Sequence, residues 1–327
     1  MPFATYMNLC LTHPTLGYYT RPREQGGIFG AEGDFVTSPE MNQKFGEALA
    51  VWFIAQWRKS GGKGKEKKKK IRLVELGPGK GTLMSDILRV VRQVSDAREA
   101  LESVHLVEMS GWLREVQRGV LRDTEVEVIW YDSIEEVEGR DDVYTMIVAN
   151  EFLDALPVHV IERTRAGWRE VMVGLTDDGG RRLGFTINPR ESIRANVLGH
   201  SSPRFTSAVK VGEWLEVSPS VLKTSRKIGE LVSLGGSSLV IDYGGDCVFG
   251  RSVRGFRGHS IVDVFDRPGE SDLTANVDFG YVREGGVGGG GGVDMIGPIE
   301  QGKFFLTEIG FELNILTCNS HKIVAFI

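Results

Sequence analysis

Cysteine is scarce in this chain of 327 residues, and the little there is forms no pattern. Cys10, Cys247 and Cys318 are scattered and odd in number, and they include no CxxC pair that could bind a metal or act as a redox dithiol. We therefore expect no metal site that is built from cysteines. This scarcity of cysteine also suits a protein of a reducing compartment.

Long apolar runs are missing as well. No stretch approaches the roughly 20 residues that a helix needs to cross a bilayer, so membrane insertion is not expected. The opening MPFATYMNLCL has neither a signal-peptide pattern nor the Arg/Ser-rich character of a transit peptide. Either the protein works where it is made, or this chain lacks its natural N-terminus.

Positive charge is not in excess, because 39 Lys and Arg face 44 Asp and Glu, a net charge of −5. The chain has no general attraction to phosphate backbones or anionic membranes, and nucleic acid is not an expected partner. The one basic run, GGKGKEKKKK at residues 61–70, is interpreted as a solvated loop between a helix and a strand rather than as a docking patch.

The chain alternates apolar strand patterns with helical ones. The expected strands are residues 71–76, 104–109, 126–131, 144–150 and 237–244, and the expected helices are residues 82–94, 111–121 and 218–235. Near-continuous apolar strands separated by helices predict an α/β fold, in which helices cover both faces of a doubly wound parallel sheet.

This pattern divides the chain into three parts. An N-terminal helical cap (residues 1–60) has a helix that begins at Ser38, with Pro39 in its first turn. The core is formed by residues 71–157 and 236–327, and residues 158–235 form an insertion on the substrate side. Within the core, the glycine run at residues 285–292 is interpreted as a flexible loop.

The strongest motif is VELGPGKGTL at residues 74–83, an apolar strand that ends in a glycine-spaced turn and opens a helix. A dinucleotide loop would have glycine where the chain has Thr82, and a phosphate-binding loop would have Ser or Thr at Gly81, so NAD and ATP are disfavoured. The G-x-G-x-G form resembles the motif of class I, Rossmann-like methyltransferases, whose ligand is S-adenosyl-L-methionine. The residues expected at this ligand are Glu75, Gly77, Pro78, Gly79 and Gly81. Glu75 can face the ammonium group of the ligand or order the loop.

Acids also follow the next two strands. Glu108 can accept hydrogen bonds from both ribose hydroxyls of a nucleoside. Asp132 and Ser133 follow the third strand, where a carboxylate can receive the adenine amino group, although a surface turn fits them nearly as well. Ligands of open α/β sheets bind at the carboxyl ends of the strands, which favours a shared site.

The fourth strand ends in NEFLDALPVH, which includes Asn150, Glu151, Asp154 and His159. An arginine acceptor stays protonated at ordinary pH, and two carboxylates can hold its guanidinium beside a methyl donor. We expect Glu151 and Asp154 to do this, with a charge pair that caps a following helix as the alternative. His159 can move a proton, but a structural role is the more common one.

Six motifs together make the chain resemble one family. They are LGYYT (16–20), GDFVTSPEMNQKFGE (33–47), VELGPGKGTL (74–83), NEFLDALPVH (150–159), SVRGFRGH (252–259) and DLTANVDF (272–279). In this order and at similar spacing they resemble the MidA-like family of mitochondrial complex I assembly-factor protein arginine methyltransferases, over roughly residues 11–311.

This resemblance implies a methyltransferase fold with a helical cap and an insertion, a mitochondrial matrix location, and symmetric dimethylation of an arginine on a complex I core subunit. It also implies that the cap contributes to the cofactor site. The cap residues so implied are Gly33, Asp34, Thr37, Ser38 and Pro39, although plain helix capping explains the same segment.

The ends of the chain depart from the family pattern. The chain starts almost at the first motif, and the residues after Phe311, ELNILTCNSHKIVAFI, do not resemble the family's closing helix and aromatic-rich strand. A missing last strand would leave a sheet edge unpaired.

Two other functions stay open. A complex I assembly chaperone could keep the fold without catalysis, and a methyltransferase could act on a small molecule or a nucleic acid, although no basic groove favours the latter. The expected partner is a protein substrate, and a homodimer is left open.

Overall fold

The computed structural model describes residues 1–22, 38–61, 69–176, 182–289, 291–310 and 321–327. The predicted loop at residues 61–70 therefore lies mostly outside the described residues. No helix in the described part of the chain is long and apolar enough to span a membrane.

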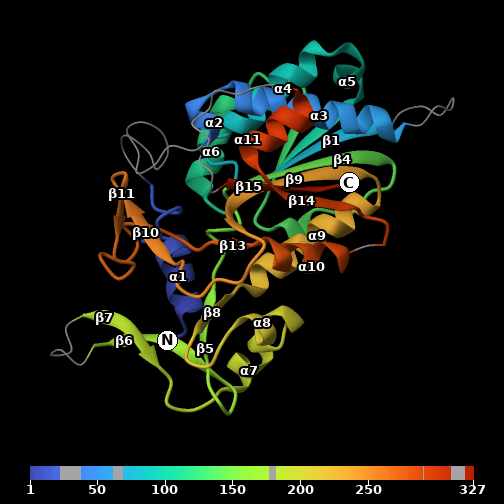
Figure 1. The fold of residues 1–327 in the computed structure, drawn as a ribbon. Coiled ribbons are helices and arrows are strands. Elements are labelled where there is room, and N and C mark those ends of the chain that lie inside the picture. The colour runs from blue at the N-terminus through green and yellow to red at the C-terminus, as the bar shows by residue number, and fades with distance from the viewer. Residues whose placement is uncertain (23–37, 62–68, 177–181, 290, 311–320) are drawn as a thin grey trace.

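The helices alternate with strands through much of the chain (Figure 1). The helices are α1 (Phe3–Thr12), α2 (Ser38–Met41), α3 (Lys44–Ser60), α4 (Thr82–Gln93), α5 (Ser95–Ala100), α6 (Gly111–Val120), α7 (Ile193–Gly199), α8 (Pro203–Ala208), α9 (Pro219–Ser233), α10 (Phe279–Val287) and α11 (Gln301–Phe304), with single turns η1 (Ile134–Glu136) and η2 (Phe305–Ile309). The strands are β1 (Lys70–Leu76), β2 (Leu101–Val107), β3 (Glu127–Tyr131), β4 (Val143–Asn150), β5 (His159–Arg163), β6 (Trp168–Leu175), β7 (Leu183–Ile187), β8 (Trp214–Val217), β9 (Gly236–Gly245), β10 (Arg254–Arg257), β11 (Ser260–Val262), β12 (Asp272–Thr274), β13 (Val277–Asp278), β14 (Met295–Glu300) and β15 (His321–Phe326).

The described strands form one large sheet and two small ones. The large sheet has the order β14-β15-β9-β4-β1-β2-β3, with β13 paired to the end of β9. Strands β1, β2, β3, β4 and β9 are parallel to their neighbours within this group, whereas β15 and β14 are antiparallel. The α/β fold class predicted from the sequence is confirmed, and the parallel strands end at one edge of the sheet.

Helices cover both faces of the large sheet (Figure 1). On one face, α3, α4 and α5 pack against β1, β2 and β4 through a core that includes Trp57, Ile87 and Leu106. On the other face, α9 and α10 pack through Ile228 and Phe279. The apolar helix predicted from Ser38 is present but divided, because α2 ends at Met41 and α3 begins at Lys44.

The N-terminal helix joins the small sheets rather than the face that α3 covers. Helix α1 contacts β5, β6 and β12, and the Tyr6 hydroxyl donates to the Val264 carbonyl at 2.7 Å. Strands β5 to β8 form an antiparallel sheet in the order β7-β6-β5-β8, and β10 to β12 form another in the order β11-β10-β12. The described helices of residues 1–60 therefore divide between two packing layers, with α1 against the small sheets and α3 against the large sheet.

Helix α9, which falls within the predicted insertion (residues 158–235), packs on the large sheet in the structure. Helix α9 contacts α10, β9 and β4, so it belongs to the layer that covers the large sheet.

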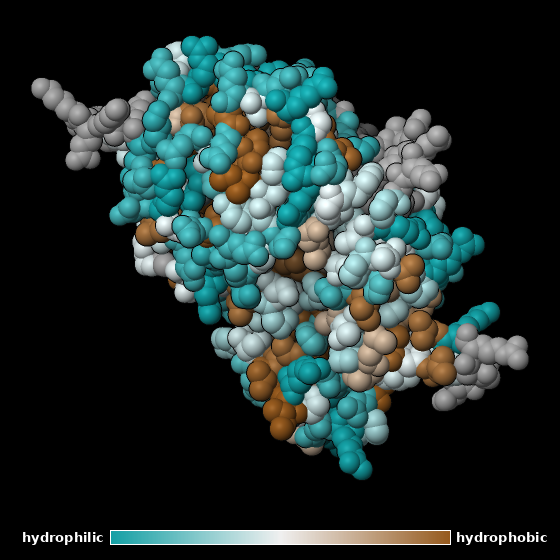
Figure 2. Space-filling model, turned by 180° about the vertical axis from the view of Figure 1, so that it is seen from behind, coloured by the Kyte–Doolittle hydropathy of each residue, from teal (hydrophilic) through white to brown (hydrophobic). Residues whose placement is uncertain are grey.

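Figure 2 shows hydrophobic side chains gathered on the lower part of the molecule, which carries the β5–β8 sheet. Exposed apolar residues on these elements and on α7 include Leu175, Ile187, Ile193 and Val197.

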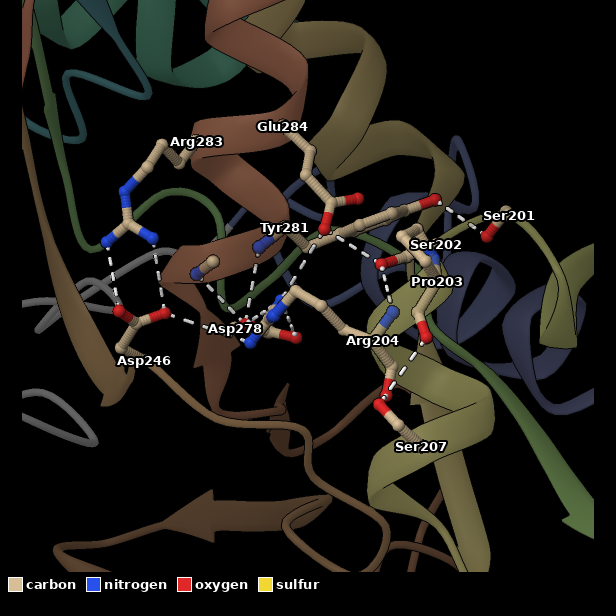
Figure 3. A network of polar contacts seen from close by, with 11 residues as sticks. Ser201, Ser202, Pro203, Arg204, Ser207, Asp246, Asp278, Tyr281, Arg283 and Glu284 are labelled. Carbon is tan, nitrogen blue, oxygen red and sulfur yellow. Dashed lines mark hydrogen bonds and ion pairs between the residues drawn. The ribbon is translucent and has the colours of Figure 1, made fainter.

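A charged network ties the insertion to the large sheet (Figure 3). Arg204 of α8 lies 2.9 Å from Asp278, whose side chain accepts hydrogen bonds from the first turn of α10. A side chain at Gly280 would overlap the Arg204 guanidinium. On the same helix, Arg283 contacts Asp246 at 3.0 Å, just beyond β9. The network fixes α8 relative to the end of β9.

The final strand of the sheet is present. Residues His321–Phe326 form β15, which pairs with both β9 and β14. The possibility of a missing last strand is therefore wrong, because the continuous apolar run IVAF buries Ile323 in one core and Val324 and Phe326 in the other.

The glycine run at residues 285–292 is partly helical rather than a loop throughout. Gly285 and Gly286 lie within α10 and are buried against α9. A Cβ atom at Gly285 would lie only 2.7 Å from the Leu222 carbonyl oxygen and 2.8 Å from Ser225 Cβ. The absence of side chains lets the two helices approach closely, and the packing offsets the entropic cost of glycine.

Gly285→Ala should therefore destabilise the protein by about 1–3 kcal/mol, since a backbone atom must move to admit the methyl group. Urea unfolding measures the change. The matched control is Gly119→Ala on α6, where an added Cβ meets nothing within 4 Å and should gain about 0.5–1 kcal/mol. Equal effects of the two substitutions would contradict the close packing of α9 and α10.

Candidate functional site

A cavity of about 810 Å³ opens at the carboxyl ends of the parallel strands. Its walls come from the segments after β1, β2, β3, β4 and β9, from α1 and α2, and from the β10–β12 sheet. The cavity therefore joins the large sheet to the added elements around it. We call the part nearest β1, β2 and β3 its cofactor end, and the part lined by Asp154, Tyr243 and Asp272 its acceptor end.

The glycine loop after β1 forms one wall of the cofactor end. Gly77, Gly79 and Gly81 have φ angles of 63°, 53° and 87°, a region that favours glycine. A Cβ atom at Gly77 would lie 2.7 Å from the Phe152 ring. Gly77, Pro78 and Gly79 line the cavity, whereas Gly81 lies at the start of α4 and faces Gln117.

Glu75 is the acid that faces this loop. Only 3% of the residue is exposed, and its Oε2 atom has no hydrogen-bond partner among the described residues. Burial raises the pKa of the Glu75 carboxyl to about 8, although a hydrogen bond from the Met84 backbone partly offsets this effect. A buried carboxylate oxygen without a partner suits a cationic group of a ligand.

Glu108 and a glutamine that the sequence analysis missed form a connected network behind the loop. The Ser110 N–H donates to Glu108 Oε1 at 2.8 Å, and Gln117 Nε2 donates to Glu108 Oε2 at 3.3 Å and to the Gly79 carbonyl at 2.8 Å. Trp130 Nε1 donates to Gln117 Oε1 at 2.8 Å. Burial raises the pKa of Glu108 to about 7. A polar residue on the buried face of an amphipathic helix was the available signal for Gln117.

Asp132 and Ser133 line the same end of the cavity. The Asp132 side chain is 73% exposed and forms an ion pair with Arg114. The Ser133 hydroxyl accepts a hydrogen bond from the Glu135 N–H at 3.4 Å, at the start of η1. Both residues line the cavity and also lie in a surface turn. The interpretation as a ligand contact and the interpretation as a surface turn are therefore compatible.

The N-terminal segment reaches the cavity through α2. Pro39 and Glu40 line it, and Glu40 lies 3.7 Å from Lys80 of the glycine loop. Ser38 is the first residue of α2. The predicted residues Gly33, Asp34 and Thr37 lie outside the described residues.

The segment after β4 brings Asn150, Glu151 and Asp154 to the cavity. Glu151 has a φ angle of 50° and donates its backbone N–H to the Ile241 carbonyl at 2.8 Å. No helix follows, because the next element is β5, so helix capping does not explain the two acids. Asn150 Oδ1 is buried without a hydrogen-bond partner among the described residues.

Asp154 lies within a cluster of buried acids that the sequence analysis did not assemble. Burial, together with Asp242, Asp272 and Glu151, holds the pKa of Asp154 well above its ordinary value, and Arg254 partly offsets this effect. Asp242 accepts hydrogen bonds from the backbone N–H groups of Leu153, Asp154 and Tyr243 at 2.8, 3.3 and 2.8 Å. Burial raises its pKa to about 7.

Two hydrogen-bonded pairs of side chains complete the acceptor end. Tyr19, which follows α1, donates its hydroxyl to Asp272 Oδ1 at 2.6 Å. Arg254 donates to Asn276 Oδ1 at 2.9 Å. All four side chains line the cavity. They come from the LGYYT, SVRGFRGH and DLTANVDF motifs, so the motif likeness was the only signal for them.

The structure does not bring His159 to this cluster. His159 starts β5 and pairs with Val217 of β8 in the insertion, and it is not among the residues that line the cavity. The turn at Leu156 and Pro157 carries the chain away from the large sheet. Burial and Arg194 lower the pKa of His159 below its ordinary value. Among the described residues, no group of three or more His, Cys, Asp or Glu is arranged to hold a metal.

A parallel sheet with a glycine loop after its central strand and acids at the neighbouring strand ends is the arrangement of a nucleoside-binding methyltransferase. The family described as "Putative S-adenosyl-L-methionine-dependent methyltransferase" matches residues 48–299. The chain belongs to this family, and its cofactor is S-adenosyl-L-methionine. The family predicted from the sequence motifs is thus confirmed.

Similar proteins include two that are named "Protein arginine methyltransferase NDUFAF7, mitochondrial". The Danio rerio protein is 38% identical, across 94% of this chain and 73% of its own length, and the Homo sapiens protein is 35% identical, across 95% and 70%. A solved structure from Burkholderia thailandensis, bound to S-adenosyl-homocysteine, matches with a TM-score of 0.75 at 24% identity, across 100% of this chain and 87% of that one. The likeness to this solved structure supports the assignment of the fold.

The residues at the cofactor end fit this cofactor. The ligand carries an ammonium group, for which the unpaired Oε2 atom of Glu75 is a suitable acceptor. The glycine loop leaves room for backbone contact, and Glu108 offers carboxylate oxygens at the end of β2. The donor set therefore suits an amino acid joined to a nucleoside, without a phosphate group.

The raised pKa of Glu75 predicts a pH-dependent stability of the free chain. The carboxyl has an ordinary value of 4.5, and the folded chain retains its proton up to about pH 8. Its stabilising contribution is therefore full below pH 4.5 and is lost as the pH rises through 8.

Glu75→Gln should remove this dependence, so the variant's free energy of unfolding should fall less with rising pH, by up to about 1.4 kcal/mol per pH unit. Urea unfolding of both proteins across this pH range measures the difference. Parallel curves for the two proteins would mean that Glu75 is ionised in the folded chain.

Proposed function

We propose that the chain transfers a methyl group from S-adenosyl-L-methionine to an arginine side chain of a protein. The observation that carries this proposal is the cluster of buried acids at the acceptor end. Glu151, Asp154, Asp242 and Asp272 lie close together there, and Arg254 offsets only part of the effect of the other acids on Asp154. Burial and mutual repulsion disfavour the ionised form of these carboxyls, and a cation beside them would relieve that cost, which favours a cationic acceptor. The names of the similar proteins support arginine.

We assign the cofactor to the other end of the cavity. Glu75 would hold the ammonium group, the glycine loop would give backbone contacts to the ligand, and Glu108 would accept from the ribose hydroxyls. Asp132 would receive the adenine amino group, with Ser133 beside it. The other proposed residues that line the cavity are Pro39, Gly77, Pro78, Gly79 and Asn150. The motif likeness adds Ser38 and Gly81, and also Gly33, Asp34 and Thr37, which lie outside the described residues.

The acceptor residues work by holding charge and protons. When it is bound, S-adenosyl-L-methionine supplies an activated methyl group on its sulfonium. Glu151 and Asp154 hold guanidinium nitrogens and keep another nitrogen oriented toward that methyl group. When the new N–C bond forms and the C–S bond breaks, the nitrogen must release one proton. Asp154 lines the cavity and its pKa lies well above the ordinary value, so once ionised beside the guanidinium its carboxylate would be basic enough to take that proton.

The family likeness extends the proposal in its finer parts. We infer that the product is symmetric dimethylarginine, that the substrate is a core subunit of respiratory complex I during assembly, and that the protein works in the mitochondrial matrix. A homodimer remains compatible with this activity. His159 is left without a catalytic role in this scheme.

A chaperone without catalysis is the second candidate. The exposed apolar residues of the insertion, such as Leu175 and Ile193, favour a protein partner in either case. The buried acids distinguish the two functions, because a chaperone gains nothing from a costly group of desolvated carboxylates at a cofactor pocket.

The proposal predicts labelled methylarginine. The purified chain, incubated with S-adenosyl-L-methionine that carries a trideuterated methyl group and with a mitochondrial protein extract, should label arginine, and fragmentation should identify the symmetric dimethyl form. Glu151→Gln should lower the rate about 10- to 100-fold, as the loss of one hydrogen bond to a charged group implies. The affinity for the cofactor should stay within about threefold, since the cofactor end is intact.

The matched control is Glu162→Gln, which changes a carboxylate on β5 that does not line the cavity and should leave the rate unchanged. Label on residues other than arginine would contradict the acceptor. Cofactor binding without transfer to any protein would favour the chaperone.

A further inference from the structure

One face of the β10–β12 sheet forms part of the cavity surface. Residues that lie opposite each other in an antiparallel pair project to the same face, as do residues two apart on one strand. The register pairs Phe256 of β10 with Ile261 of β11 and with Asp272 of β12, and it pairs Arg254 with Thr274. All five residues line the cavity. We call this face the β10–β12 wall.

The β10–β12 wall runs from the buried acids to the surface of the molecule. Asp272 and Thr274 on β12 are 2% and 5% exposed, whereas Ile261 on β11 is 71% exposed. Strand β10 lies between these two strands, so Arg254 and Phe256 occupy the middle of the wall. A ligand that enters beside β11 and reaches the acids therefore crosses the side chains of β10.

Arg254 and Thr274 carry buried polar atoms that the described residues leave without a hydrogen bond. The Arg254 guanidinium donates from Nη2 to Asn276 Oδ1 at 2.9 Å, but its Nε atom has no partner among the described residues. Thr274 Oγ1, which belongs to the residue directly opposite, also lacks one there. A buried donor without a partner is costly, so a ligand oxygen between these groups would stabilise both.

The surrounding charges favour a neutral oxygen over a carboxylate. Asp272 belongs to the same wall, and Arg254 is close enough to Asp154 to affect its ionisation. These acids would repel a carboxylate, whereas a carbonyl oxygen has no net charge and has two lone pairs for two donors. In the acceptor proposed for this cavity, an arginine of a protein, such carbonyl groups belong to the main chain.

We propose that Arg254 and Thr274 bind a main-chain carbonyl of the acceptor peptide, which lies along the β10–β12 wall with its arginine side chain directed to the buried acids. This inference rests on the proposed function, in which those acids receive the guanidinium. The Phe256 ring, whose centroid lies 5.6 Å from Arg254 Cζ, helps to hold the Arg254 guanidinium in place. The wall thus selects an arginine within a peptide over a free guanidinium compound.

Two probes separate the carbonyl contact from the guanidinium contact. N-acetyl-L-arginine amide has main-chain carbonyl groups, whereas n-butylguanidine has the same charge and a similar aliphatic chain without them. Calorimetry measures the binding of each probe to the full chain saturated with S-adenosyl-homocysteine. The wild-type chain should bind the amide about tenfold more tightly than n-butylguanidine, as one hydrogen bond from a charged group implies.

Arg254→Met and Thr274→Val should reduce this ratio of affinities, to about twofold or less in Arg254→Met and by about threefold in Thr274→Val. The ratio excludes the effect of the Arg254 charge on a bound guanidinium, because that effect is common to both probes. The matched control is Arg257→Met, since Arg257 lies on the same strand, donates to Ser271 and does not line the cavity. Its ratio should equal that of the wild-type chain.

The affinity for S-adenosyl-homocysteine is the internal control for folding and should stay within about threefold in all variants. If Arg254→Met loses this affinity, the ratio in Thr274→Val decides, and a wild-type ratio there would overturn the inference. Equal binding of the two probes by the wild-type chain would also overturn it, while the proposed function stands. If the wild-type chain binds neither probe, the proposed acceptor site fails and the inference fails with it.

Discussion

The hydrogen bonds to Asp242 hold the acceptor end of the cavity together. This fully buried carboxylate accepts from the backbone N–H groups of Leu153 and Asp154 after β4 and from its neighbour Tyr243 in β9. A desolvated carboxylate is costly unless donors surround it, and here the donors come from the segment that carries the proposed acceptor acids. The ends of β4 and β9 are thereby fixed to each other, and the positions of Asp154 and Tyr243 follow.

The cavity itself depends on two kinds of structure. Parallel strands bring the glycine loop, Glu75 and Glu108 to one edge because their carboxyl ends coincide. The opposite wall is built from elements far apart in sequence, namely Tyr19 after α1 and Asp272 and Arg254 on the β10–β12 sheet. The contacts between Arg204 and Asp278 hold the insertion beside this wall. The cofactor end thus belongs to the sheet, whereas the acceptor end joins the ends of β4 and β9 to the additions around the sheet.

This division explains what the sequence could predict. The strands and the helices between them could be predicted from local apolar periods. The acids at the strand ends could then be predicted to share one site, because the carboxyl ends of parallel strands lie together at one end of the sheet. The partnership of Asp154 with Asp242 and Asp272 depends on pairing between distant segments, which no local pattern encodes. Gln117 was missed for the same reason, because its importance lies in contacts with Glu108 and the glycine loop.

The errors also have physical causes. The glycines at residues 285 and 286 were assigned to a loop from their conformational freedom, but close contact between α9 and α10 outweighs that freedom. His159 was grouped with the acids because it is near them in sequence, although the turn before β5 separates them in space. The last strand was doubted because its residues differ from the family pattern, yet their continuous apolar run is sufficient for a strand that pairs with β9 and is buried on both faces.

The central claim is that the edge of the large sheet binds S-adenosyl-L-methionine through the glycine loop. Calorimetry of this cofactor with the purified chain and with Gly79→Val tests it most directly, because a branched side chain at a φ angle of 53° would both strain the loop and enter the cavity. The account predicts binding by the wild-type chain and its loss in the folded variant. A folded wild-type chain that does not bind, or a variant that binds equally well, would contradict it.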